Sequence, residues 1–345
     1  MSPRTVAEQI VAQLIEAGVE RIYGIVGDSL NPIVDAVRRS GGSKDGGIDW
    51  VHVRHEEAAA FAASAEAQLT GKLAVCAGSC GPGNLHLING LYDANRSGAP
   101  VLAIASHIPS VQIGSSFFQE THPDRLFVEC SVYTELISTA EQSPRVIHSA
   151  VQQAVGKSGV AVVTLPGDIA DQARPGAPAF VRTGTPSLVP SMADVEALAV
   201  AVNEASTVAI FAGAGVRDAR AELLELAEVL GAPIGHSLRG KEFVQYDNPF
   251  DIGMTGLLGY GAAHDGIHDA DLLLLVGTDF PYDQFLPDDV RTAQIDSAAE
   301  NLGRRTSLDL AVHGDAKRRW RHCCTWCTAR TIANSCRARS IVTTP

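Results

Sequence analysis

Amphipathic helices alternate with short apolar runs along most of this chain of 345 residues. Apolar side chains recur at helical spacing from Val6 to Leu14, and the run RIYGIV that follows is apolar enough for a buried strand. Asn31 and Pro32 have the residue types of an N-cap and a first helical position. The chain is therefore predicted to begin with a helix, a strand and a second helix.

The same alternation continues through the first half of the chain. Further helices are predicted to begin near His55, near Leu85 and near residue 143, and the stretch before residue 143 is less regular. The strands between these helices are WVHV, LAVCAG, VLAIAS and VAVVTL. Strands that alternate with helices form a parallel sheet covered on both faces. A complete α/β domain is thus predicted over residues 1–171.

A proline-rich segment follows this domain. Residues 172–191 contain four Pro and little periodicity, which is typical of an extended linker, and we place it at 172–192. The alternation then resumes over residues 193–316, with helices at 192–205 and 220–230 and the strands TVAIFAG, DLLLLVG and TAQID. The predicted fold is α/β, with two domains that each hold a doubly wound parallel sheet.

Composition narrows the classes of function. The chain is 46% hydrophobic and has no run of about 18 apolar residues, so neither a membrane span nor a secretion signal is predicted and the default compartment is the cytoplasm. Its net charge of −12 argues against a nucleic-acid binder, because phosphate contacts need clustered Lys and Arg. Three scattered cysteines in the body of the chain, Cys76, Cys80 and Cys130, do not form a disulfide framework, and Cys80 is predicted to be a small core residue.

Two adjacent glutamates, Glu56 and Glu57, precede an alanine-rich run in RHEEAAAFAASAEAQLTGK. On a helix that begins near His55, the alanines let another backbone or a ligand approach closely. Glu56 then lies beyond the strand WVHV, at the edge where open α/β sheets bind ligands. A carboxyl group partly withdrawn from water there suits a residue that must hold or share a proton. The alternative is that both acids only decorate a helix N-terminus, where the helix dipole favours negative charge.

Other segments are less specific by themselves. Gly27, Gly81 and Gly83 lie in predicted strand-to-helix loops, where glycine permits close approach of the backbone to a ligand. The segment from Gly213 to Gly215 follows a strand and could hold a pyrophosphate on its backbone N–H groups, although it lacks the full dinucleotide fingerprint. Asp296 ends the strand TAQID, where it could bind a ribose or adenine group or simply stabilise a turn.

The order of four segments adds a family resemblance to this picture. YGIVGDSLNPIVDAV, RHEEAAAFAASAEAQLTGK, GSCGPGNLHLINGLYDANRSGAPVLAI and FFQETHPDRLF resemble the pyrimidine-binding domain of thiamin diphosphate enzymes of the pyruvate oxidase, pyruvate:quinone oxidoreductase and acetolactate synthase group. The second predicted domain resembles the central, Rossmann-like FAD-carrying domain of the same enzymes, and GKEFVQYDNPFDIGMTGLLG is most similar to the pyruvate:quinone branch. The resemblance extends to about residue 316.

The resemblance implies specific roles. Glu56 matches the glutamate that hydrogen-bonds N1′ of the cofactor's aminopyrimidine and so promotes removal of the thiazolium C2 proton, whereas Glu57 has no matching role. The matching cofactor and substrate contacts are Val26, Gly27, Gly81, Gly83, Asn84, Phe118 and Gln119. The matching FAD contacts are Gly213, Gly215, Gly256, Gly277, Asp296 and Asp315.

The resemblance also implies an activity and an assembly. The expected reaction is oxidative decarboxylation of pyruvate with thiamin diphosphate and FAD, and the electrons pass to a quinone. The expected assembly is a homo-oligomer, either a dimer or a tetramer, in the cytoplasm or in peripheral contact with the membrane. Two alternatives remain open: an acetolactate synthase-type carboligase, and a catalytically silent flavoprotein fragment.

The sequence departs from the family in one respect. The family's third domain binds the diphosphate through Mg²⁺ with a Gly-Asp-Gly motif and a later Asn, which are the oxygen ligands that a hard cation prefers. This sequence contains only GDS, GDI and GDA triplets, in other domains, so no metal ligands are predicted in it. We therefore expect a truncated chain that is inactive by itself.

The final segment, residues 317–345, breaks with the composition before it. Cys324 and Cys327, with Cys323, Cys336 and His322 nearby, have the residue types of a zinc site, but their spacing matches no paired CxxC arrangement. A shifted reading frame across Trp320–Cys324 can encode Leu-Ala-Ala-Leu-Leu, an apolar helical pattern. From about Arg318 onward we therefore predict out-of-frame translation and a disordered or poorly packed tail.

Overall fold

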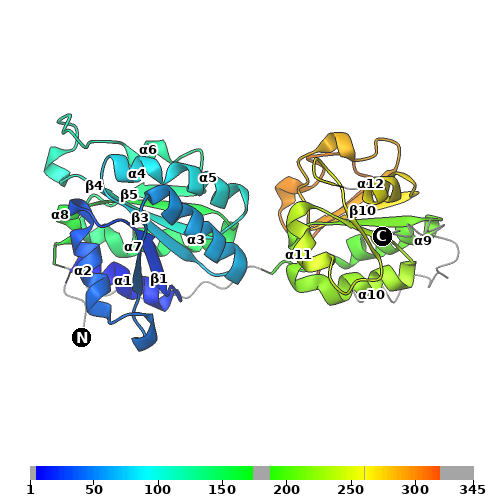
Figure 1. Cartoon of the computed structure of the whole chain (residues 1–345), viewed down its shortest axis with the longest axis horizontal. Coiled ribbons are helices and arrows are strands. Elements are labelled where there is room, and N and C mark those ends of the chain that lie inside the picture. Colours follow the sequence, from blue (N-terminus) through cyan, green and yellow to red (C-terminus); the bar gives the residue numbers. More distant parts are fainter. Residues whose placement is uncertain (1–4, 174–186, 260, 319–345) are drawn as a thin grey trace, which may run out of the picture. The chain divides into compact units, whose positions relative to one another are not determined.

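The computed structural model describes residues 5–173, 187–259 and 261–318, which form two compact units, Met1–Pro186 and Ser187–Pro345 (Figure 1). The boundary between the units falls inside the predicted linker. The linker range 172–192, however, includes residues at each end that belong to the two units. Gln172 accepts a backbone hydrogen bond from Val6 at 3.0 Å, and Leu188 accepts one from Asp315 at 2.8 Å. Both ends of the predicted linker thus pack into their own unit. The predictions for the tail fall on residues 319–345, outside the described residues.

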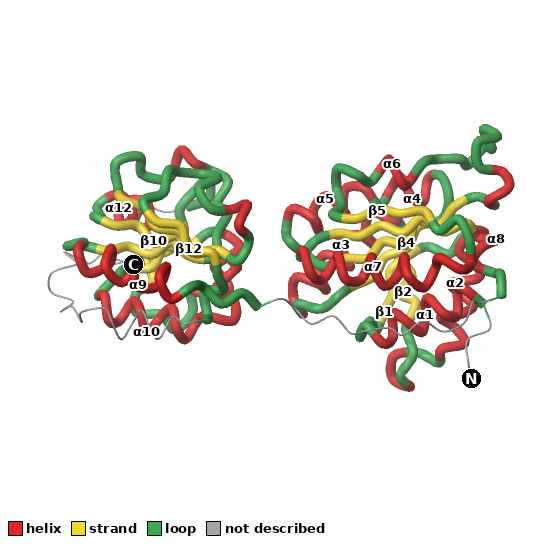
Figure 2. The backbone as a smooth tube through the Cα atoms, turned by 180° about the vertical axis from the view of Figure 1, so that it is seen from behind, coloured by secondary structure: helices red, strands yellow, loops and turns green. Residues whose placement is uncertain are grey.

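The first unit is built on a six-stranded parallel sheet with the order β2-β1-β3-β4-β6-β5 (Figure 2). Every neighbouring pair in this sheet runs parallel, for example Ile22 of β1 beside Val75 of β3. The strands are β1 (Arg21–Gly24), β2 (Asp49–His52), β3 (Ala74–Gly78), β4 (Val101–His107), β5 (Tyr133–Leu136) and β6 (Val160–Pro166). The helices are α1 (Val6–Glu16), α2 (Asn31–Ser40), α3 (Glu56–Thr70), α4 (Pro82–His86), α5 (Ile88–Arg96), α6 (Pro123–Leu126), α7 (Ser143–Lys157) and α8 (Gly167–Ala170).

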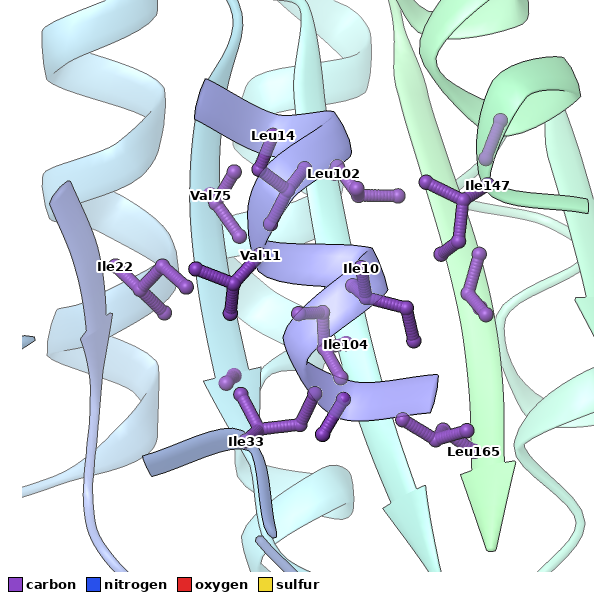
Figure 3. Close-up of a cluster of buried hydrophobic side chains, with 14 of the residues drawn as sticks. Ile10, Val11, Leu14, Ile22, Ile33, Val75, Leu102, Ile104, Ile147 and Leu165 are labelled. Atoms are coloured by element: carbon purple, nitrogen blue, oxygen red, sulfur yellow. The ribbon is translucent and has the colours of Figure 1, made fainter. Parts of the chain in front are cut away.

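Helices cover both faces of this sheet. Side chains of α1, α2, α7 and α8 pack with Ile22, Val75, Leu102 and Ile104 on one face, and Figure 3 shows Ile10 and other side chains of α1 among those of the strands. Side chains of α3 and α5 pack with the alternate strand positions on the other face. Because strand side chains alternate between faces, the nearly continuous apolar strands predict a sheet buried on both sides.

The alanine-rich helix α3 is closely packed, as predicted. Ala59, Ala60 and Ala63 are fully buried, and α5 lies against them. A Cβ added at Gly90 of α5 would lie 2.5 Å from the Cβ of Ala60 and 2.6 Å from the backbone nitrogen of Phe61. Only glycine at residue 90 lets the two helices come this close. The small residues therefore fix the position of α3, which carries Glu56 at its first turn.

The second unit also has a six-stranded parallel sheet, with the order β12-β11-β10-β7-β8-β9. Its strands are β7 (Val208–Ala212), β8 (Ile234–His236), β9 (Asp251–Met254), β10 (Leu272–Val276), β11 (Arg291–Asp296) and β12 (Leu310–His313). Helices α9 (Met192–Glu204) and α10 (Arg220–Leu230) pack on one face of the sheet with α11 (Lys241–Val244), and α12 (Gly261–His268) packs on the other. The predicted fold class, α/β with two doubly wound parallel sheets, is confirmed.

Each sheet has one point at which the strand order reverses. In the first unit the chain passes from β1 to β2 on one side and later adds β3 on the other side of β1. In the second unit β8 and β10 flank β7 in the same way. Loops leave such a switch point in opposite directions and open a crevice at the carboxyl ends of the strands, where α/β proteins bind ligands. The two candidate sites are therefore expected after β1 and β3 and after β7 and β10.

Several elements differ from the sequence predictions. Strands β5, β8, β9 and β12 and helices α6, α8, α11 and α12 were not predicted, because they are short or lie in stretches of irregular composition. The helix expected near Leu85 is two helices, α4 and α5, that meet at Leu87. Asn31 is the first residue of α2 rather than its N-cap, because a 3₁₀ turn from Asp28 to Leu30 runs directly into the helix. Among the described residues, no helix has the length and apolar character needed to cross a membrane.

Candidate functional site

Glu56 is the first residue of α3, just beyond the carboxyl end of β2. The preceding residue, His55, is the N-cap of this helix, and its Nδ1 atom accepts a hydrogen bond from the backbone N–H of Glu57 at 3.2 Å. This cap fixes where the helix begins and therefore where the Glu56 side chain starts. That side chain is only 11% exposed, so its carboxyl group is largely withdrawn from water.

Two neighbours define the surroundings of the Glu56 carboxyl group. Its Oε2 atom lies 3.1 Å from Nδ1 of His86, which is the last residue of α4. Its Oε1 atom would lie 3.2 Å from a Cβ added at Gly83. Glycine at residue 83 thus lets the backbone of the loop after β3 lie directly beside the carboxylate. A larger residue there would crowd the carboxyl group, which would have to shift by a few tenths of an ångström.

Hydrogen bonds of three serines join the loops at the carboxyl ends of β1, β3 and β4. Ser29 lies after β1, and its Oγ atom accepts from the backbone N–H of Cys80 at 3.0 Å and lies 3.0 Å from Oγ of Ser79. Ser106, near the end of β4, donates from Oγ to the carbonyl of Ser29 at 2.6 Å. The loops after β1 and β3 and the end of β4 are therefore held together by side-chain hydrogen bonds before any ligand is present.

The predicted glycine and asparagine positions lie within these loops. A Cβ at Gly27 would lie 2.4 Å from Oγ of Ser79, so the loops after β1 and β3 touch at this point. Gly81 has a φ of +68°, a left-handed conformation that favours glycine. Asn84 is fully buried and donates from Nδ2 to the carbonyl of Ser106 at 2.6 Å. Its Oδ1 atom is buried and has no hydrogen-bond partner among the described residues.

The remaining predicted residues differ in exposure. Val26 is 52% exposed and Phe118 is 85% exposed, and several other large apolar side chains of the described residues are exposed as well. Gln119 lies beside Gly81, and its Oε1 atom is 3.6 Å from the buried Sγ atom of Cys80. The structure thus brings Gln119 to the crevice, whereas the Phe118 ring contacts Phe117 and is otherwise open. Cys80 is buried, as predicted.

His55, Glu56 and His86 offer three ligand atoms within 4.8 Å of one another, the residue types that zinc takes in proteins. Hydrogen bonds that these residues already make would compete with binding of a metal ion. Nδ1 of His55 already caps α3, and Oε2 of Glu56 already faces His86. A metal ion bound through these two atoms would replace both contacts. The arrangement is better described as a chain of hydrogen-bonded groups that surrounds one buried carboxyl.

These features fit the aminopyrimidine of thiamin diphosphate. A flat heterocycle needs a narrow cleft with one apolar wall and, opposite a ring nitrogen, a group that can share a proton. Val26 supplies exposed apolar surface, Gly27 and Gly83 let the neighbouring loops lie close together, and Glu56 supplies the carboxyl. The unpartnered Oδ1 atom of Asn84 is a further buried acceptor. The residues present therefore fit the cofactor's pyrimidine end.

At the second switch point the loops after β7 and β10 touch directly. A Cβ at Gly213 would lie 2.4 Å from the carbonyl oxygen of Gly277, and one at Gly215 would lie 2.6 Å from its Cα atom. The backbone N–H of Gly213 donates to Val276 at 3.0 Å, and that of Gly215 donates to Gly277 at 2.9 Å. Both amides are already paired, which corrects the prediction that they would hold a pyrophosphate. The contact between the loops explains the glycines.

The other predicted FAD residues share this edge of the second sheet. Gly256 follows β9 with a φ of +114° and lies against the ring of Phe280. Asp296 ends β11, and its Oδ1 atom accepts from the backbone N–H of Ala298 at 2.9 Å. Asp315 follows β12 and accepts from the N–H of Lys317 at 2.8 Å. All six predicted positions thus lie beyond the carboxyl ends of the strands, but both aspartates are engaged by their own turns.

Asp296 is a buried carboxyl at this edge. Burial is the main influence on it and raises its pKa above the ordinary value of 3.8. Asp279, in the loop after β10, differs: burial alone would raise its pKa, but the guanidinium groups of Arg305 and Arg304 hold it below 3.8. An ionised carboxylate is therefore disfavoured at Asp296 and favoured at Asp279.

This contrast predicts opposite effects on stability. The stabilising contribution of protonated Asp296 is present below pH 3.8 and is lost as the pH rises through the raised pKa. Asp296→Asn cannot ionise, and its Oδ1 atom can still accept from Ala298, so the variant should be more stable than the wild type at neutral pH. Its advantage should vanish below pH 3.8. Urea unfolding of both proteins across this pH range measures the difference.

Asp279→Asn is the matched control. It removes a carboxylate whose pKa is lowered, so it should destabilise the protein at neutral pH, and this cost should shrink as the pH falls through the lowered pKa. If both variants shift the free energy of unfolding in the same direction at neutral pH, the conclusion that burial raises the pKa of Asp296 is wrong.

Sequence reasoning missed several residues of the first site. His86 and the serines at 29, 79 and 106 have no motif of their own and become neighbours only through the sheet order. One signal was available: GPGNLH places His86 three residues after Gly83 on a short predicted helix, which puts both near the same loop.

Family models match both units. Residues 4–126 match the N-terminal TPP binding domain of thiamine pyrophosphate enzymes, and residues 195–321 match the central domain of the same enzymes. The two family matches, in this order along the chain, agree with the two doubly wound sheets and identify the thiamine pyrophosphate enzyme family. The chain belongs to this family.

Individual relatives agree with this assignment. The chain is 34% identical over 316 residues to the pyruvate oxidase of Lactiplantibacillus plantarum, a match that spans 89% of this chain and 52% of that protein. It is 30% identical over 331 residues to a probable acetolactate synthase large subunit of Methanocaldococcus jannaschii, spanning 90% of this chain and 54% of that protein. An uncharacterized 42.6 kDa protein of Pseudomonas amyloderamosa is 56% identical over 318 residues, 91% of this chain and 79% of its own length. The chain thus spans about half the length of the two relatives named for an enzyme activity.

Proposed function

We propose that the protein takes part in the oxidative decarboxylation of pyruvate with thiamin diphosphate and FAD, and that the electrons pass to a quinone. The observation that supports this most directly is the Glu56 carboxyl group, buried at the first switch point and held by His86 at 3.1 Å. The similarity to a pyruvate oxidase over 316 residues supports the choice of substrate. The oligomer, the quinone and a peripheral contact with the membrane belong to the proposal as well.

Thiamin diphosphate supplies a carbon nucleophile and an electron sink for the carboxylate that leaves. The chain's own residues bind and orient its pyrimidine end. Val26 offers an apolar contact, and glycine at residue 83 lets the backbone lie directly beside Glu56. Glu56 holds or releases a proton at Oε1, the oxygen that faces the Gly83 side of the cleft. Withdrawal of this carboxyl from water strengthens its interaction with a ring nitrogen.

The second unit is proposed to hold FAD at its own switch point. The loops after β7, β9, β10, β11 and β12 converge on one edge, which is where doubly wound sheets bind nucleotides. The paired amides of Gly213 and Gly215 imply that other groups contact the pyrophosphate. Gly256 and Gly277 add no side chains to these loops. Asp296 and Asp315 are the candidate polar contacts at this edge.

A second candidate function is acetolactate synthase-type carboligation. It is favoured by the 30% identity to a probable acetolactate synthase large subunit, which matches the chain over nearly the same length as the pyruvate oxidase does. The two reactions share the decarboxylation step; afterwards the two-carbon unit is oxidised, with its electrons passed to the flavin, in one reaction and is added to a second 2-keto acid in the other. Residues of the first site serve both, so this site does not by itself separate the two reactions.

A product assay separates these functions. Because the chain spans about half of its enzyme relatives, we would use a hybrid in which it replaces the matched residues of the L. plantarum pyruvate oxidase. With ¹³C-labelled pyruvate, thiamin diphosphate, Mg²⁺, FAD and a soluble quinone, the hybrid should release CO₂, form acetate and reduce the quinone. Acetolactate as the main product would favour the carboligase. Bound flavin with no pyruvate turnover would indicate a catalytically silent flavoprotein.

A further inference from the structure

His86 is hydrogen-bonded to the buried Glu56 carboxyl group and is itself partly exposed to solvent. Its Nδ1 atom lies 3.1 Å from Oε2 of Glu56, and its side chain is 45% exposed, whereas that of Glu56 is 11% exposed. The ring stacks on His55 with centroids 4.3 Å apart and an interplanar angle of 26°. The imidazole is therefore held with one nitrogen at the carboxyl group and the rest of the ring at the surface.

Hydrogen-bond chemistry assigns the protons of this cluster. When the Glu56 carboxyl is ionised it only accepts hydrogen bonds, so Nδ1 of His86 is the donor, and a neutral His86 then has its lone pair on Nε2. Nδ1 of His55 accepts from the backbone N–H of Glu57, so a neutral His55 carries its proton on Nε2. The two stacked rings thus have opposite tautomers, and only His86 has a hydrogen-bonding proton that points at Glu56.

Other nearby acids are engaged elsewhere. Glu57 accepts from Nδ2 of Asn89 at 2.6 Å, and its side chain is exposed. The opposite oxygen of Glu56 faces Gly83, which has no side chain to carry a proton. A ligand seated against this oxygen would also cover the remaining exposure of the carboxyl group. With such a ligand in place, His86 is, among the described residues, the titratable side chain that remains hydrogen-bonded to Glu56.

We propose that His86 relays protons between Glu56 and solvent. In the inward direction, Nε2 of His86 takes a proton from water and Nδ1 passes its own proton to Oε2 of Glu56. In the outward direction, Oε2 returns a proton to Nδ1 and Nε2 releases one to water. Each transfer moves one proton in and one out, and the imidazole changes tautomer. The role in catalysis rests on the proposed function, but the proton exchange itself does not.

The test uses the chain without any cofactor. Histidine is labelled with ¹⁵N, long-range NMR spectra assign the tautomers, and exchange of the His86 Nδ1 proton with water is measured at low temperature. Glu56→Gln is the informative variant, because the Gln Oε1 atom can still accept the hydrogen bond but the amide cannot take the proton. Glu57→Gln is the matched control, since its carboxyl contacts Asn89 instead.

The relay predicts the Nδ1–H tautomer for His86 in the wild type and in both variants. It also predicts that exchange of this proton slows on the order of tenfold or more in Glu56→Gln and is unchanged in Glu57→Gln, because an acid-base partner is lost only in the former. An unchanged exchange rate in Glu56→Gln, or an Nε2–H tautomer in the wild type, would overturn the proposal. Either result can be read even if the hybrid turns over no pyruvate.

Discussion

Replacing Glu56 by glutamine in the hybrid is expected to lower pyruvate turnover by about 10²- to 10⁴-fold, the usual contribution of a positioned acid-base group. Glutamine keeps the size of the side chain and can still accept from His86, but it cannot hold or release a proton. Decarboxylation should therefore fall even when the cofactor is saturating. Single-turnover release of CO₂ from labelled pyruvate measures this step directly.

Glu57→Gln provides the comparison for this result. The residue is adjacent in sequence and occupies the same first turn of α3, but its side chain is 39% exposed and bonds to Asn89. Any general effect of removing a negative charge from the helix N-terminus would appear in both variants, at about 1 kcal/mol or less. A loss of turnover of similar size in both would show that Glu56 contributes only charge. Near-normal turnover of Glu56→Gln would remove it from the mechanism.

Gly90→Ala is expected to destabilise the protein by about 3 kcal/mol, at the upper end of the usual cost of overpacking. The added Cβ would lie 2.5 Å from the Cβ of Ala60 and 2.6 Å from the backbone nitrogen of Phe61. A flexible side chain could move aside, but α3 and α5 must separate instead. Because α3 carries Glu56 and α4 carries His86 beside it, the same change should also disturb the contact between them. Urea unfolding measures the loss of stability.

Gly156→Ala is the matched substitution in another helix of the same unit. A Cβ added at residue 156 of α7 meets no atom within 4 Å. Alanine is a better helix former than glycine, so this variant should be neutral or more stable by about 0.5–1 kcal/mol. If both alanine variants are stabilised, the close contact of α3 with α5 is not a constraint on the fold.

The regular parts of the fold could be predicted from the sequence. The apolar strands and the helices between them are local patterns: α7 begins where a helix was predicted near residue 143, and α10 has the predicted range 220–230. Strands β8 and β9 could not be, because Ile234–His236 is too short for a period and Asp251–Met254 is a four-residue segment that begins with an acid and contains a glycine. Their place is set by pairing with the sheet rather than by local preference.

The site could be predicted only in part. Glu56 was singled out by its place beyond the strand WVHV and before an alanine-rich helix, and the family resemblance gave it a role. His86 was not identified, because its partner lies 30 residues away and only the order β2-β1-β3 brings them together. The amides of Gly213 and Gly215 were misjudged for a similar reason. A GxG motif does not reveal whether its N–H groups are already paired with a neighbouring strand.

The central claim is that the first switch point binds the aminopyrimidine of thiamin diphosphate through Glu56. An NMR titration of the labelled chain with thiamin diphosphate tests it without requiring any turnover. We expect saturable shifts of the backbone signals of Val26, Glu56 and Gly83, with the signals of the second unit unchanged, and much weaker binding by Glu56→Gln. Shifts that are absent at this edge of the first sheet, or equal in wild type and Glu56→Gln, would contradict the account.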